Sequence, residues 1–84
     1  MEPEEAYGRV LRAARKRRGL SQEKLALDAG VERNYISLIE LGRNSPSLRV
    51  QFKLSAVLAQ SPSALIAQAE ELLQAGQKRG RGRR

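Results

Sequence analysis

The sequence contains no cysteine and no histidine among its 84 residues. These absences exclude disulfide bonds, the usual zinc sites and histidine-based catalysis. A nucleophile would then need a serine–lysine pair or two carboxylates in a cleft, and no spacing in the sequence indicates either arrangement. We therefore expect a protein that is not an enzyme and that holds no metal ion or other cofactor.

Long apolar runs are missing as well. No segment approaches the roughly 20 apolar residues that a membrane-spanning helix needs. The acidic start, MEPEEA, differs from the basic beginning of a signal peptide. We expect a cytoplasmic protein without a membrane partner. Its length allows one domain with a modest core, and domains of this size often gain stability by forming oligomers.

The charge is strongly positive and unevenly distributed. The formal net charge is +7, which suggests a polyanionic partner. Five of these charges, with no acid among them, lie at the C-terminus, on Lys78, Arg79, Arg81, Arg83 and Arg84. We expect residues 76–84 to form a flexible basic tail that adds non-specific phosphate affinity. Insertion of Arg79-Gly80-Arg81 into a minor groove and contact with RNA stay open as alternatives.

The segment from Ser21 to Asn44 carries the clearest local pattern. Ser21 is a good N-cap for a first helix, whose apolar positions are Leu25, Ala26 and Ala29. Gly30 suits the turn that ends this helix. A second helix is predicted from about residue 33 to residue 41, ending at Gly42. Residues 21–42 thus predict a helix-turn-helix, whose second helix enters the DNA major groove.

The second helix has two distinct sides. Ile36 and Ile39 form its apolar side at helical spacing. The groups on the other side suit base edges in the major groove, and they belong to Arg33, Asn34, Ser37 and Leu38. A small bundle with a merely solvated polar face is the alternative. The place of this helix after the Ser21 helix and the Gly30 turn favours DNA reading.

Three further helices complete an all-α, five-helix prediction. The first runs from about Pro3 or Glu4 to Arg18 and buries Tyr7, Val10, Leu11 and Ala14. The fourth runs from Leu48 to about Ala59 and buries Leu48, Phe52 (or its neighbour Val50), Leu54 and Leu58. The fifth covers about residues 62–75 and has an apolar stripe of Leu65, Ile66, Ala69, Leu72 and Leu73.

The fifth helix provides the predicted dimer interface. Helices one to four largely fill the core of a domain this small, so a second copy is the better cover for the C-terminal part of the stripe. The alternative is that the stripe packs back on its own domain, which fits Leu65 and Ile66 best. We thus expect a domain over residues 1–75 that dimerises through its last helix, followed by the basic tail.

The segments RKRRGLSQEKLALDAGV, NYISLIELGRNSPSL and Ser61-Pro62-Ser63 resemble the Cro/C1-type (lambda-repressor-like, XRE) helix-turn-helix regulators. The likeness covers about residues 7–73 and is greatest to small phage repressors and restriction–modification controller proteins. It implies a compact five-helix domain of bacterial or phage origin. It further implies a homodimeric transcriptional repressor or controller that binds a palindromic operator in double-stranded DNA.

The resemblance also assigns roles to single residues. It implies an Arg15–Glu40 ion pair, because Glu40 lies toward the inner side of the reading helix. Phosphate contacts are expected from Ser21, Gln22, Tyr35, Arg43 and Asn44. The chain departs from the family pattern at four positions. Glu32 is the N-cap, where we expect its carboxylate to cap the helix, with acceptance from a cytosine amino group as the alternative. Gln51 replaces an apolar residue, and Ala59 and Gln60 replace a glycine and the apolar residue that follows it.

Two other functions fit the same fold. An antitoxin-type module would bind a partner protein through the fifth helix, and such modules also bind DNA. A general nucleic-acid binder would depend on the basic tail and ignore sequence. Burial of Leu72 and Leu73 in a symmetric dimer favours a repressor or controller, whereas an exposed stripe in a monomer favours a different protein partner.

Overall fold

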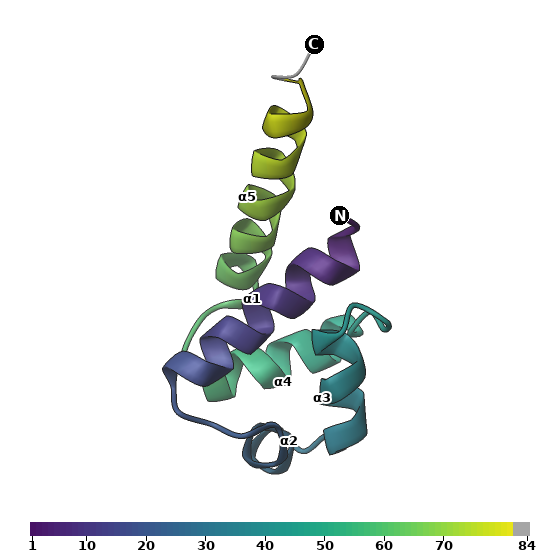
Figure 1. Cartoon of the computed structure of the whole chain (residues 1–84). Coiled ribbons are helices and arrows are strands. Elements are labelled where there is room, and N and C mark those ends of the chain that lie inside the picture. Colours follow the sequence, from purple (N-terminus) through teal and green to yellow (C-terminus); the bar gives the residue numbers. More distant parts are fainter. Residues whose placement is uncertain (82–84) are drawn as a thin grey trace.

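The computed structural model consists of five helices and confirms the predicted all-α architecture. They are α1 (Pro3–Arg17), α2 (Gln22–Ala29), α3 (Arg33–Glu40), α4 (Leu48–Leu58) and α5 (Pro62–Arg81). The structure describes the backbone of residues 1–81 and the side chains of residues 1–76. In Figure 1, α1 crosses the molecule between α5 on one side and α2, α3 and α4 on the other. Within the described residues, no helix is long and apolar enough to span a membrane.

Polar caps and glycines define the helix ends that the sequence predicts. The Ser21 hydroxyl oxygen accepts a hydrogen bond from the Lys24 amide at 3.0 Å and starts α2. The Ser47 hydroxyl oxygen does the same for the Val50 amide at 3.2 Å and starts α4. Gly30 ends α2 in the left-handed conformation, with φ +72°. These short-range signals set the helix boundaries to within about two residues.

A single apolar core joins all five helices. The stripe predicted for α1 is confirmed, since Tyr7, Val10, Leu11 and Ala14 are all buried. The other helices complete the core with Leu25, Ala26, Ala29, Ile36, Ile39, Leu54, Leu58, Leu65 and Ala69. Because α1 packs on both α5 and α3, it holds the reading helix and the last helix in one body.

The predicted packing of α4 is wrong at two positions. Leu48 is 69% exposed and Phe52 is 58% exposed. Leu54 and Leu58 are buried, and Val50 packs partly against the core. Residues two apart in a helix differ by about 200°, so Val50 and Leu54 lie on the opposite side from Leu48 and Phe52. The helix therefore presents an apolar surface to solvent.

The fifth helix also differs from its prediction. It extends to Arg81 rather than ending near residue 75. Leu65 and Ala69 are buried in the domain's own core, so these two residues leave the proposed dimer surface. Ile66 is 42% exposed, and Leu72 and Leu73 are partly buried. The expected roles of Lys78, Arg79, Arg81, Arg83 and Arg84 fall on side chains outside the described residues.

Ala59 closes α4 in an unfavourable conformation. Its φ is +57°, and it is the one non-glycine residue with positive φ in the part of the chain that the structure describes. A Cβ atom in this region crowds the neighbouring carbonyl, whereas glycine has no such penalty. We expect Ala59→Gly to raise the free energy of unfolding by about 0.5–1 kcal/mol, measured by urea denaturation. A loss of stability would show that Ala59 makes contacts that outweigh this strain.

Candidate nucleic-acid interface

The turn after α2 sets the orientation of α3, so that one side of this helix faces solvent. The Val31 amide donates to the Ala26 carbonyl at 3.0 Å and closes the turn that follows Gly30. Ile36 and Ile39 are fully buried and anchor the inner side of α3. The four predicted base-reading residues remain accessible: Arg33 and Asn34 are exposed, and Ser37 and Leu38 are half-buried. Their accessibility gives α3 one continuous surface that mixes a guanidinium, an amide, a hydroxyl and an aliphatic group.

Glu40 fixes α3 to the two preceding helices. Arg15 Nε donates to Glu40 Oε2 at 2.7 Å, and Arg15 Nη2 donates to Oε1 at 3.0 Å. Gln22 Nε2 also donates to Oε1, at 3.0 Å. The ion pair inferred from the family pattern is thus present, and its side chains are only 9% and 3% exposed. The hydrogen bond to Glu40 raises the pKa of Arg15, against the opposing effect of burial.

These contacts occupy the side chain of Gln22, which donates to Glu40. The phosphate contact expected at Gln22 therefore rests on its backbone amide at the start of α2. Sequence analysis did not identify Gln22 as part of the Arg15–Glu40 contact. A glutamine at the first helical position is also typical of a surface side chain, so no local pattern predicts this bond.

The prediction that the Glu32 carboxylate caps α3 is wrong, and the Tyr35 hydroxyl already has a partner within the protein. Glu32 is the N-cap of α3, but its side chain makes no capping hydrogen bond. The glutamate stem is longer than that of the preferred capping residues, so the carboxylate does not turn back to the helix amides. The Tyr35 hydroxyl accepts the Ser47 amide at 3.4 Å, and its ring packs partly against the core. Its proton is still available for donation.

The remaining residues expected at phosphates flank α3. Ser21 precedes α2 and lies at the surface. Arg43 and Asn44 are exposed in the loop that leaves α3. Gly42, with φ +75°, starts this loop directly after the helix. Hydrogen-bond donors therefore lie on both sides of the reading helix.

Gly8 is a structural residue that sequence analysis missed. A Cβ atom built on Gly8 would lie 2.3 Å from the carbonyl oxygen of Ile39 and 2.9 Å from that of Glu40. The backbones of α1 and α3 are therefore almost in contact at this point. A glycine inside an otherwise regular helical pattern was the available signal, because such a residue often marks a close approach.

Tyr7 is the one acidic side chain with a strongly raised pKa in the part of the chain that the structure describes. Its ring is buried in the core and its hydroxyl has no hydrogen-bond partner among the described residues. Burial raises its pKa from 10.0 to about 12. The neutral phenol is therefore favoured in the folded protein.

This shift predicts a loss of stability at alkaline pH. Between pH 10 and about 12 the unfolded chain ionises Tyr7 and the folded chain does not, so the free energy of unfolding falls. A shift of this size corresponds to at most roughly 3 kcal/mol, fully present below pH 10, of which about 2 kcal/mol is lost by pH 11.5. Urea denaturation of wild type and Tyr7→Phe at pH 8 and pH 11.5 measures it. Equal losses in the two proteins would assign the effect to other groups.

Comparison with known proteins gives several independent similarities in sequence. A helix-turn-helix family model matches residues 11–65. The HTH-type transcriptional regulator SlrR of Bacillus subtilis is 44% identical over 52 residues, which are 61% of this chain and 34% of that protein. The chain thus spans about a third of that regulator's length. An uncharacterized HTH-type transcriptional regulator of Archaeoglobus fulgidus is 40% identical over 47 residues, covering 56% of this chain and 67% of the relative.

Solved structures show the same architecture. The clp gene regulator ClgR of Corynebacterium glutamicum is similar with a TM-score of 0.83 and 29% identity, over 93% of this chain and 85% of that one. The restriction-modification controller protein C.AhdI of Aeromonas hydrophila is similar with a TM-score of 0.72 and 37% identity. That similarity covers 74% of this chain and 94% of the controller protein.

Proposed function

Because this chain belongs to the Cro/C1-type helix-turn-helix family of DNA-binding transcriptional regulators, we propose that it is a cytoplasmic homodimer that binds a palindromic operator. The observation that carries this proposal is the exposed side of α3, held in place by the buried bonds of Glu40. Two copies related by a two-fold axis would place their reading helices about one DNA turn, roughly 34 Å, apart. Repression or control of transcription then follows from occupation of that operator.

Base reading is assigned to the outward residues of α3. Arg33 is suited to guanine O6 and N7, and Asn34 to adenine N6 and N7. Ser37 provides a hydroxyl, and Leu38 provides an apolar contact for a thymine methyl group. The free Glu32 carboxylate lies at the start of the same helix and can accept from a cytosine amino group.

Phosphate contacts would hold this helix in register from both sides. The backbone amide of Gln22 and the hydroxyl of Ser21 face one strand, where the N-terminus of α2 favours an anion. Arg43 and Asn44 supply donors from the loop after α3, and Tyr35 retains its hydroxyl proton. Contacts of this kind fix position without reading sequence.

We assign a second copy of the chain as the cover for the exposed apolar side chains of α4 and α5. Leu48 and Phe52 on α4 and Ile66 on α5 are all well exposed, and Leu72 and Leu73 are only partly covered. In Figure 1, α5 extends past the rest of the domain, so its C-terminal half is open to a partner. Burial of these side chains in a symmetric interface would remove a large apolar area from water.

Two substitutions distinguish contacts with bases from contacts with phosphates. We expect Arg33→Ala to cost about 1–3 kcal/mol of operator affinity and to relax preference at one base position. Arg43→Ala should weaken binding to all duplexes. It should also reduce the slope of the logarithm of the binding constant against the logarithm of salt concentration by about one. Fluorescence anisotropy with an operator and a scrambled duplex at several salt concentrations measures both effects. Unchanged operator preference in Arg33→Ala would show that another face of α3 meets the bases.

A further inference from the structure

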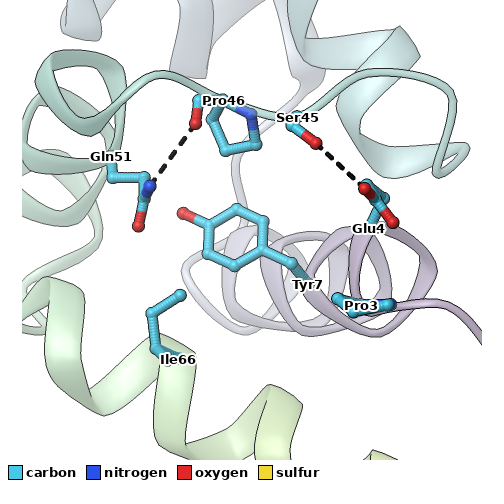
Figure 2. Close-up of a pocket in the computed structure, with 7 residues that line it drawn as sticks. All are labelled: Pro3, Glu4, Tyr7, Ser45, Pro46, Gln51 and Ile66. Atoms are coloured by element: carbon cyan, nitrogen blue, oxygen red, sulfur yellow. Dashed lines mark hydrogen bonds between the residues drawn. The ribbon is translucent and has the colours of Figure 1, made fainter.

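A small pocket lies where α1, the loop before α4, α4 itself and α5 meet. Its volume is about 170 Å³, and it is lined by Pro3, Glu4, Tyr7, Ser45, Pro46, Gln51 and Ile66. Figure 2 shows the Tyr7 ring in the middle of these side chains, with its hydroxyl pointing toward Gln51. The walls are mainly apolar, because proline rings, an isoleucine and the face of the tyrosine form most of them.

One polar group in this pocket lacks a partner, and a second has a free acceptor. The Tyr7 residue is 5% exposed, and its hydroxyl makes no hydrogen bond within the described residues. The Gln51 amide nitrogen donates to the Pro46 carbonyl at 3.4 Å, which leaves the amide oxygen free to accept. A buried hydroxyl is usually hydrogen-bonded, so this one points to a group that enters the pocket. The hydroxyl has an accessible area below 1 Å², so a ligand reaches it only when a neighbouring side chain moves, and Figure 2 shows Gln51 as the side chain that it faces.

The charge of the lining residues limits which ligands the pocket can bind. Glu4 is the one charged residue among those that line it, and its carboxylate accepts the Ser45 hydroxyl at 3.3 Å. No lysine or arginine is among the described lining residues. An anionic ligand would meet a carboxylate without any compensating cation. A neutral ligand meets no electrostatic repulsion from the Glu4 carboxylate.

We propose that this pocket binds a small neutral organic molecule that carries a carboxamide or hydroxyl on a short branched apolar body. The ligand oxygen accepts from the Tyr7 hydroxyl, and the ligand N–H or O–H donates to the Gln51 amide oxygen. The apolar body packs on Pro46 and on the ring of Tyr7. Such a mixed pocket, apolar with a few convergent polar groups, is the usual form of a small-molecule site.

Titration of the ¹⁵N-labelled full chain by NMR tests this proposal. Isobutyramide is the probe, and sodium isobutyrate is its control of the same shape with a carboxylate. We expect saturable shifts at Tyr7, Ser45 and Gln51 with isobutyramide at millimolar concentrations, as befits a ligand of so few atoms. Isobutyrate should give no saturable shift at these residues. Equal shifts with both compounds, or none with isobutyramide, would overturn the proposal.

Matched variants assign the binding to the two polar groups. Tyr7→Phe removes the hydroxyl and keeps the ring, and it should weaken isobutyramide binding roughly fivefold or more. Ser63→Ala removes an exposed hydroxyl on α5, outside the pocket, and should leave binding unchanged. Gln51→Leu gives a second test at a half-exposed position in case Tyr7→Phe does not fold. Wild-type affinity in both pocket variants would contradict the site.

Discussion

Glu40→Ala is expected to lower the free energy of unfolding by about 3–5 kcal/mol, the largest effect of any single substitution outside the apolar core. The variant leaves the Arg15 guanidinium buried without its carboxylate and also removes the acceptor of Gln22. For a domain of this size, the melting temperature should fall by roughly 12 °C or more. Thermal unfolding followed by circular dichroism measures it.

A matched control distinguishes this ion pair from an ordinary surface pair. Lys24 and Asp28 are 3.2 Å apart, but their side chains are 56% and 36% exposed. Asp28→Ala should therefore cost at most about 0.5 kcal/mol. The double variant Arg15→Met with Glu40→Leu should recover much of the lost stability, because no charge is left buried. Melting of Glu40→Ala within two degrees of wild type would show that the pair contributes little.

Gly8→Ala is expected to cost about 3 kcal/mol, at the upper end of the range for overpacked cores. The new methyl group would lie 2.3 Å from the Ile39 carbonyl oxygen, which is backbone and has no alternative rotamer. The helices α1 and α3 would have to move apart, and the Arg15–Glu40 bonds cross the same interface. Urea denaturation measures the loss.

Gly76 provides the control for Gly8. It lies in α5, and a Cβ atom there would meet nothing within 4 Å. Gly76→Ala should raise stability slightly, because alanine favours the helix by up to about 1 kcal/mol over glycine. Two glycine-to-alanine changes in helices thus have opposite expected signs. A Gly8→Ala protein as stable as wild type would contradict the close approach of α1 and α3.

Signals that act over a few residues were sufficient to predict most of the fold. Ser21, Gly30 and Ser47 end or begin helices through their own side chains or backbone freedom, so they work without tertiary context. The α1 stripe repeats at true helical spacing and therefore defines a single buried side. The resemblance in residues 7–73 then added the Arg15–Glu40 contact, which no local pattern predicts.

Tertiary packing decided the features that sequence analysis missed. Apolar residues at every second position from Leu48 to Leu54 do not define one helical side, so the buried side of α4 depends on its neighbours. The stripe of α5 is continuous, but α1 covers Leu65 and Ala69 and leaves Ile66 open. The effect of Gly8 depends on a backbone distant in sequence. To predict each of these features, one must know which helices are in contact in the folded protein.

Selection of bound sites from random DNA duplexes at physiological salt tests the central claim most directly. The full chain, a chain ending at Gly76 and the variant Phe52→Glu would be compared. We predict one palindromic motif for the first two, with half-site centres about 10 base pairs apart. Phe52→Glu, whose charge enters the proposed dimer surface, should enrich only a half-site. Absence of any enriched motif with the full chain would contradict a sequence-specific dimeric regulator.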